Sequence, residues 1–248
     1  MGNIIDINSL IKYYGNFKAL NRVSFRVEKG QIFGYLGSNG AGKTTTIKIL
    51  LGLMKASSGE VRVFGGDTFP DTPNSLKLRA AIGSVLEFNG LLEDRTGLDN
   101  LIFWAGLYNI DKADGLVLAE KLMDLVQLEE WADVKVGKYS YGMCKRLAIA
   151  RCLISDPELL ILDEPTLGVD PESRHLIREL LKDLSEKGKT IFISSHDLGE
   201  IQKICSHLAI IKKGNILFKG SLDDLIKQYA DEREFSLEDV YLKIVKEE

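Results

Sequence analysis

Residues 37–44 read GSNGAGKT, a glycine-rich run that ends in lysine and threonine. Its glycines let backbone N–H groups approach phosphate oxygens at dihedral angles and distances that a side chain would block. In this pattern the lysine reaches the β- and γ-phosphates and the following hydroxyl ligates Mg²⁺. The stretch therefore predicts a loop that binds a nucleoside triphosphate, with candidate contacts at Gly37, Ser38, Asn39, Gly40, Ala41, Gly42, Lys43, Thr44 and Thr45.

The segments around this loop have the order that its chemistry requires. A nearly continuous apolar run, QIFGYLG at 31–37, leads into it, and the helical TTTIKILLGL at 44–53 follows it. Two further apolar runs, at 158–164 and 190–196, flank a helical pattern at 172–187. Strands that alternate with helices indicate a parallel sheet covered by helices.

The rest of the chain falls into distinct patterns. Residues 1–30 alternate apolar and polar side chains, as half-exposed strands do, and LAIIKKGNILFKG at 208–220 is typical of a hairpin. We expect an α/β fold: a P-loop NTPase core with a mixed sheet, an antiparallel β subdomain and an all-helical subdomain. The expected parts are 1–87 with 157–220 (core and β subdomain), 88–156 (helical subdomain) and 221–248 (two short helices separated by ADERE at 230–234).

Composition narrows the class of protein. The 248 residues are 45% hydrophobic and 27% charged, as in ordinary soluble proteins. A formal net charge of −4 argues against nucleic acid as a partner.

The first residues lack the features of a secretory signal, and the most apolar window, 101–110, is too short to span a bilayer. The three cysteines have no CxxC spacing, so we expect reduced core residues and a cytoplasmic location.

Acidic and imidazole side chains follow two of the apolar strands. LLILDEP places Asp163 at a carboxyl strand end, where ligands bind in α/β folds and where this carboxylate can help to hold Mg²⁺. Glu164 points elsewhere and is the natural general base to polarise an attacking water. His196 ends a neighbouring strand at the same sheet edge, so it could contact the γ-phosphate and orient Glu164.

Together these motifs resemble the ATP-binding cassette (ABC) ATPases, over nearly the whole chain. The order is that of the family: KYYGNFKAL, GSNGAGKTT, IGSVLE, YSYGMCKRLAIARCLISDPELLILDEP, TLGVD and SSH. The resemblance implies that Tyr14 stacks on adenine, although stacking alone does not exclude the adjacent Tyr13. It also implies that Ser140 and Gly142 contact the γ-phosphate of an ATP held by the other protomer.

Two positions depart from the family pattern. Tyr141 stands where relatives have a glycine close to the nucleotide, so its side chain is expected to point away. Glu87 aligns with a glutamine that ligates Mg²⁺ and senses the membrane subunit, and a glutamate here resembles bacitracin-resistance and lantibiotic-immunity subunits. The groove near residues 87–100 is where a helix of that membrane subunit would dock.

The resemblance implies an ATPase with ATP and Mg²⁺ as cofactors, acting as a homodimer or heterodimer on transmembrane permease subunits. It would lie on the inner face of the cell membrane and drive export of a drug, a peptide antibiotic or a similar amphiphile.

Two alternatives remain. A soluble ABC-type ATPase acting on ribosomes or DNA usually fuses two cassettes or carries coiled-coil insertions, and a P-loop kinase does not explain YSYGM and SSH.

Overall fold

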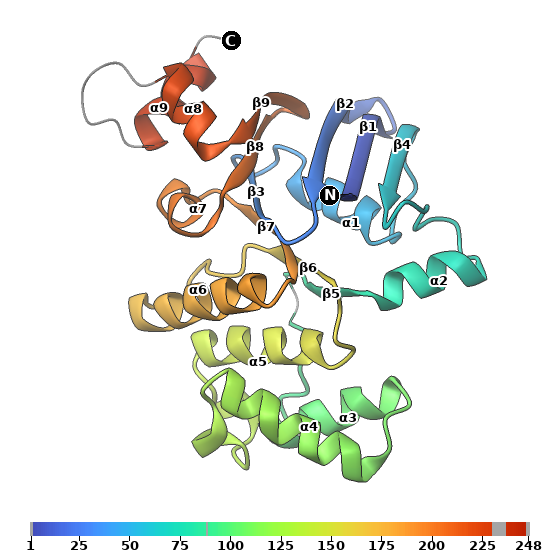
Figure 1. Ribbon diagram of the computed structural model, residues 1–248, viewed down its shortest axis with the longest axis vertical. Helices are drawn as coiled ribbons and strands as arrows, with labels where there is room; N and C mark the ends of the chain where they lie inside the picture. Colours follow the sequence, from blue (N-terminus) through green and yellow to red (C-terminus); the bar gives the residue numbers. More distant parts are fainter. Residues whose placement is uncertain (1, 88, 230–236, 247–248) are drawn as a thin grey trace.

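A computed structural model of the protein describes residues 2–87, 89–229 and 237–246. A six-stranded sheet forms its centre (Figure 1), with the strand order β5-β6-β7-β3-β8-β9. The first five strands in this order are parallel, and β9 pairs antiparallel with β8. The strands are β3 (Ile32–Leu36), β5 (Ile82–Val85), β6 (Leu159–Asp163), β7 (Thr190–Ser195), β8 (His207–Lys212) and β9 (Asn215–Ser221). The expected mixed sheet is confirmed.

The apolar runs of the sequence form the centre of this sheet. Every residue of β3, β6 and β7 is buried, because helices or a second sheet cover both faces. Parallel pairing brings the carboxyl ends of these three strands to one edge, since β7 lies between β6 and β3. The phosphate-binding loop follows β3 at this edge, Asp163 is the last residue of β6, and His196 directly follows β7.

A three-stranded antiparallel sheet lies beside the central sheet (Figure 1) and consists of β1 (Asn3–Tyr14), β2 (Phe17–Glu28) and β4 (Ser58–Val63). The alternating pattern of the sequence is confirmed here, because Val23, Phe25 and Val27 are buried and the residues between them are not. Phe25 stacks on Phe33 of β3 with 5.3 Å between ring centroids. This aromatic contact ties the two sheets together.

Helices cover the remaining surfaces. The α-helices are α1 (Lys43–Leu50), α2 (Pro73–Ala80), α3 (Gly97–Leu107), α4 (Lys112–Leu125), α5 (Tyr141–Leu153), α6 (Pro171–Glu186), α7 (Leu198–Ile204), α8 (Leu222–Tyr229) and α9 (Leu237–Lys246), with 3-10 turns at Glu129–Trp131 and Val136–Lys138. Helix α2 was not anticipated from the sequence. Its signal was present, since Thr72 and Ser75 form a capping box around Pro73 at the first helical position.

The segment between residues 89 and 156 contains helices and turns, with one isolated bridge between Thr96 and Lys135. In Figure 1, α3 and α4 lie beyond α5, at the end of the molecule away from the antiparallel sheet. Leu122 and Val126 are buried against the same core as α5 and α6. Helix α5 thus connects the outer helices to the central sheet.

The described cysteines are free, as expected from their spacing. Cys152 and Cys205 are buried, and burial raises the pKa of the Cys152 thiol to about 11. Cys144 is only half-buried and packs against the edge of the core, so the expected core position is wrong for this residue. The two helices expected after residue 220 are α8 and α9, whereas the ADERE spacer between them falls outside the described residues. None of the described helices combines the length and the hydrophobicity needed to span a bilayer.

Candidate functional site

The loop at 37–44 joins β3 to α1 at the carboxyl edge of the sheet. Gly42 is the residue before the helix and has φ +113°, a conformation that side chains rarely adopt. A Cβ at Gly42 would lie 2.7 Å from Leu20 and 3.0 Å from the carbonyl oxygen of Ala19. Glycine is therefore required here both for the turn and for the close approach of β2.

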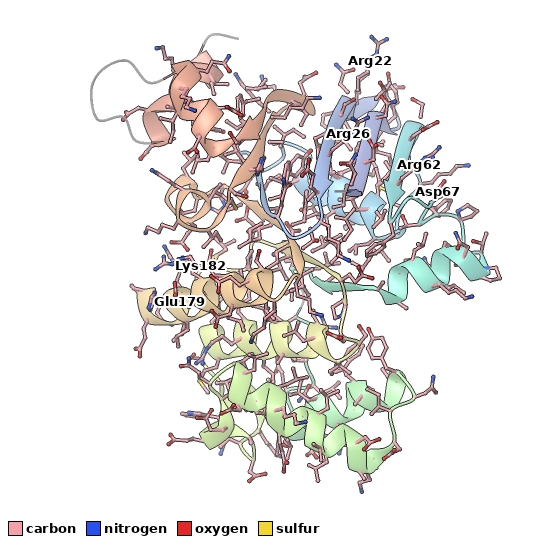
Figure 2. The ribbon with its side chains drawn as sticks, in the orientation of Figure 1. Arg22, Arg26, Arg62, Asp67, Glu179 and Lys182 are labelled. Atoms are coloured by element: carbon pink, nitrogen blue, oxygen red, sulfur yellow. The ribbon has the colours of Figure 1, made fainter. Side chains whose placement is uncertain are left out.

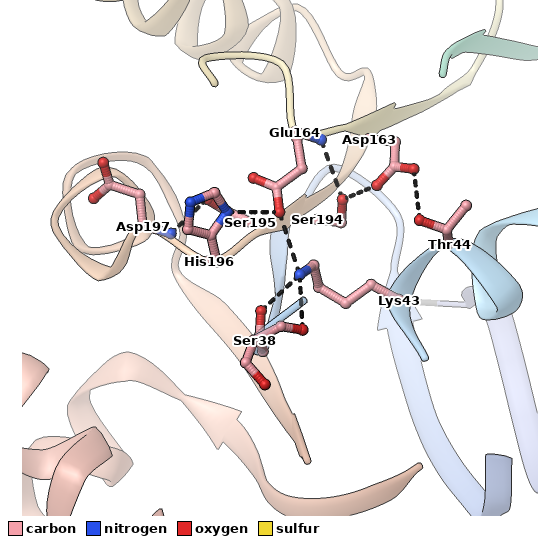
Figure 3. Close-up of polar contacts among 10 residues, drawn as sticks. Ser38, Lys43, Thr44, Asp163, Glu164, Ser194, Ser195, His196 and Asp197 are labelled. Atoms are coloured by element: carbon pink, nitrogen blue, oxygen red, sulfur yellow. Dashed lines mark hydrogen bonds and ion pairs between the residues drawn. The ribbon is translucent and has the colours of Figure 1, made fainter. Parts of the chain in front are cut away.

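Lys43 lies beneath this loop and is 6% exposed. Its Nζ donates to the carbonyl oxygens of Gly37 (2.6 Å) and Ser38 (3.3 Å), and lies 3.2 Å from Glu164 Oε1 (Figure 3). The loop carbonyls hold the lysine, because a buried ammonium requires partners. The sequence placed Lys43 and Glu164 at one site, but the direct ion pair between them is visible only in the structure.

Asp163 and Thr44 form a second group of oxygens in the same site. The Thr44 hydroxyl donates to Asp163 Oδ2 at 3.0 Å, and Ser194 Oγ donates to Oδ1 of the same carboxylate (Figure 3). A hydroxyl and a carboxylate oxygen at this separation are the hard ligands that Mg²⁺ prefers. These residues fit the proposed metal.

Glu164 and His196 are brought together from β6 and β7. His196 Nδ1 lies 3.0 Å from Glu164 Oε1 (Figure 3). Glu164 has φ +50°, a left-handed conformation that costs free energy in a residue other than glycine and is typical of functional sites. Its N–H is held by the carbonyl oxygen and Oγ of Ser194, each at 3.2 Å. The backbone thus fixes the direction in which this carboxylate points.

A cavity of about 500 Å³ opens over Lys43, Thr44, Asp163 and Glu164, whereas His196 is not among its lining residues. Its lining extends from aromatic side chains of the antiparallel sheet to the start of α5. The lining residues are Tyr14, Phe17, Ala19, Ser38, Asn39, Gly40, Gly42, Lys43, Thr44, Thr45, Glu87, Tyr141, Lys145, Asp163, Glu164 and Leu167.

The cavity includes several residues that the sequence did not single out: Phe17, Ala19, Lys145 and Leu167. Lys145 is 3% exposed, and its Nζ lies 5.3 Å from the ring centroid of Tyr141. The only sequence signal for these residues is their proximity along the chain to family motifs. Such proximity does not say which side chains face the cavity.

The structure separates the two tyrosines between which the sequence could not decide. Tyr14 lines the cavity and its hydroxyl donates to Met54 Sδ at 3.1 Å, whereas Tyr13 is not part of the lining. Each ring also lies near a lysine, with Lys18 Nζ 5.3 Å from the Tyr13 ring centroid and Lys12 Nζ 5.5 Å from that of Tyr14, so the cavity lining alone separates them. This arrangement favours Tyr14 for a contact with the nucleobase.

Ser140 and Gly142 do not line this cavity. Ser140 is exposed and caps α5, accepting a hydrogen bond from the Met143 N–H at 3.2 Å. Gly142 is buried against the start of α6. Tyr141 is 51% exposed and its ring lies beside Gly168. Glu87, which follows β5, is exposed and shares the cavity with Thr44 and Asp163.

The fold and this group of residues define the class of protein: a P-loop ATPase with an inserted helical segment. The family model for ABC transporters matches residues 20–167. The chain belongs to the ABC transporter ATPase family. It is an ATP-hydrolysing, ATP-binding subunit of an ABC transporter, and the expected family, fold class and enzyme class are confirmed.

Relatives agree with this assignment. The bacitracin transport ATP-binding protein BcrA of Bacillus licheniformis is 42% identical over 96% of this chain and 76% of that protein. A Nod factor export ATP-binding protein I of Burkholderia orbicola is 39% identical over 90% of this chain and 72% of its own.

Solved structures share the fold. An ATP-binding subunit of an ABC transporter superposes with a TM-score of 0.84 at 28% identity, covering 98% of this chain and 99% of the other. An ATP-binding cassette described as a dimer in a post-hydrolysis state, with ADP and Pi bound, has a TM-score of 0.78 at 26% identity, covering 88% and 98%.

Proposed function

We propose that this ATPase drives export of a peptide antibiotic, a drug or a similar amphiphile through transmembrane permease subunits. The observation that carries the ATPase site is the contact of Lys43 with Glu164 and of Glu164 with His196 beneath a glycine loop. The cargo class rests on the names of the bacitracin and Nod factor relatives and on the glutamate at position 87.

The proposed roles follow from the positions of the side chains. The loop 37–45 would hold the triphosphate with its backbone N–H groups, and Lys43 would neutralise phosphate charge. Glu164 would take up a proton from the attacking water, while the His196 imidazole holds its carboxylate in place. The Thr44 hydroxyl and the Asp163 and Glu87 carboxylates would hold Mg²⁺, which supplies positive charge to the phosphates.

We further propose that the complete site needs a second cassette. Ser140 and Gly142 do not line the cavity that holds Lys43, although Tyr141 between them does, and this supports assigning their proposed γ-phosphate contact to another copy or a related chain. Two charge-assisted hydrogen bonds to each of two ATP molecules would contribute about 6–12 kcal/mol, at roughly 1.5–3 kcal/mol each. Association costs about 4–15 kcal/mol, so bound ATP would decide whether the dimer forms.

This proposal predicts that a Glu164→Gln variant, which binds ATP without hydrolysing it, becomes dimeric when ATP is added. The variant should stay monomeric with ADP, because the bridging γ-phosphate is missing. Analytical ultracentrifugation with each nucleotide measures the difference. Equal sedimentation of the variant with ATP and ADP would contradict the ATP-dependent dimer. The wild-type chain is the control, because it hydrolyses its ATP and should not remain dimeric.

The proposed location is the cytoplasmic face of the cell membrane, where the permease would hold this subunit. Co-purification with a polytopic membrane protein, followed by transport of an antibiotic peptide in reconstituted vesicles, tests both partner and cargo. Recovery of this chain with ribosomes or DNA would favour the alternative, a soluble ABC-type ATPase. The net charge of −4 argues against binding to nucleic acid.

A further inference from the structure

Phe17 stands out among the aromatic side chains because it is 65% exposed and lines the nucleotide cavity. Within the described residues it takes part in no ring–ring or cation–π contact. An exposed phenyl ring at the mouth of a ligand cavity gains by covering an apolar surface of the ligand.

The strand geometry directs Phe17 to the same side as Tyr14. The two residues are cross-strand partners at the end of the β1–β2 hairpin, and their turn contains Gly15 at φ +56°. Directly opposed residues of an antiparallel pair project from the same face of the sheet. Side chains two residues apart in a strand also share a face, so Ala19 lies between this pair and the loop.

Packing contacts fix the position of this face of the β1–β2 hairpin relative to the phosphate-binding loop. The Ala19 carbonyl oxygen lies against Gly42, and the Gly214 carbonyl accepts a hydrogen bond from the Asn21 N–H at 2.8 Å. Phe25, on the same strand, stacks on the central sheet. Strand β2 is therefore held beside the phosphate-binding loop, and its first residue, Phe17, lines the same cavity as the loop.

We propose that Phe17 is a second contact for the nucleobase and forms, with Tyr14 and Ala19, an apolar platform for the flat faces and edges of the base. This inference rests on the proposed nucleotide site. Phe17 would contribute to ATP affinity and leave the hydrolytic step unchanged, because it begins β2 of the antiparallel sheet, whereas Glu164 and His196 follow β6 and β7 of the central sheet.

The experiment compares ATP with inorganic tripolyphosphate, which has the charges of ATP but no base. Phe17→Ala should weaken ATP binding about 5- to 10-fold, the lower part of the range measured for base–aromatic stacking. Tripolyphosphate binding should not change. The KM for ATP should rise with kcat unchanged, and Phe17→Tyr should restore affinity to within about twofold, because it retains the ring.

Tyr13→Ala is the matched control, because Tyr13 is on the same hairpin, is 43% exposed and does not line the cavity. It should leave binding of both ligands unchanged. The thermal midpoint of each variant checks that the hairpin is intact. Wild-type ATP affinity in Phe17→Ala, or an equal loss for ATP and tripolyphosphate, would overturn the platform. A wild-type chain that binds no ATP would overturn the proposed function as well, so the two failures differ.

Discussion

At the scale of single residues, glycines mark the places where two segments come too close for a side chain. Gly142 is buried, and a Cβ at this position would contact Ser173 Oγ and lie 3.1 Å from Asp170 Oδ2. Asp170 and Ser173 belong to the N-terminal cap of α6, in which the Ser173 N–H donates to Asp170 Oδ1 at 2.9 Å. The absence of a side chain at Gly142 thus lets α5 and α6 begin side by side.

We predict that Gly142→Ala lowers the free energy of unfolding by about 1–3 kcal/mol, the usual cost of an added methyl group in a packed interface. ATP-dependent dimerisation should weaken too, because the start of α5 must shift away from α6. Chemical denaturation measures the first effect, and sedimentation of the variant in a Glu164→Gln background measures the second.

Gly106→Ala supplies the control for Gly142→Ala. Gly106 is also in a helix, α3, and a Cβ added there would project into open space. Alanine there should stabilise the protein by roughly 0.4–1 kcal/mol, because it restricts the unfolded chain. If the two variants lost the same stability, packing against Ser173 would not be the cause.

Among the helices, α6 and α7 are joined by a charge network around the buried carboxylate of Glu200. Glu200 is 3% exposed and accepts a hydrogen bond from Arg178 Nη1 at 2.8 Å, with Arg174 at 3.8 Å. Arg174 also lies 3.6 Å from Asp197, which directly follows His196 and caps α7. The network therefore sets the position of the loop that carries His196.

We predict that Glu200→Ala costs about 1–3 kcal/mol of stability, because the partly buried Arg178 guanidinium loses its carboxylate partner, whereas Arg174 keeps Asp197. The kcat for ATP hydrolysis should fall, since the His196 loop loses its support, while the KM for ATP should change little. If the alanine variant does not fold, Glu200→Gln keeps the shape and one acceptor oxygen for Arg178, removes the negative charge and allows the same kinetic comparison. An unchanged kcat in both variants would contradict a positioning role.

Glu179→Ala is the matched control on the solvent face of α6. Glu179 pairs with Lys182 at 3.2 Å, and both side chains are about half-exposed, at 51% and 42%. Figure 2 shows the two side chains together on this helix. Exposed pairs contribute little, so stability should change by no more than about 0.5 kcal/mol and kcat should stay the same.

At the scale of the whole molecule, the proposed ATP site is divided between two parts of the chain. Lys43 belongs to the cavity over the central sheet, and Ser140 belongs to the start of α5 outside that cavity. Tyr141 and Lys145 of α5 do line the cavity, but the exposed Ser140 does not, so we propose that Ser140 serves the ATP of a second copy in a symmetric dimer with two composite sites.

We predict that Lys43→Met and Ser140→Arg are each inactive alone but recover ATPase activity when mixed. A mixed dimer contains one site with wild-type Lys43 from one chain and wild-type Ser140 from the other. An equimolar mixture should reach on the order of a quarter of wild-type activity if subunits exchange randomly and the sites act independently. Phosphate release in the mixture is the measurement. The absence of recovery would contradict a homodimer with shared sites.

Much of the fold and part of the site could be predicted from the sequence. The strand, loop and helix around Lys43 follow from local glycine chemistry and apolar runs. Asp163 and His196 follow from the rule that parallel strands present their carboxyl ends at one edge. Helix α2 was missed because its cap lies in a polar stretch, and Phe17 was missed because side-chain direction at a hairpin end depends on register.

The class of protein, the mixed sheet and the phosphate-binding loop could all be predicted from the residues, because they depend on local backbone preferences and on the periodicity of burial. Three relations became visible only in the folded chain: Tyr14 rather than Tyr13 lines the cavity, Lys43 contacts Glu164, and Ser140 does not line the cavity. The physical reason is that these relations join segments far apart in the chain, and their positions follow from the packing of the two sheets and of α5 against α6.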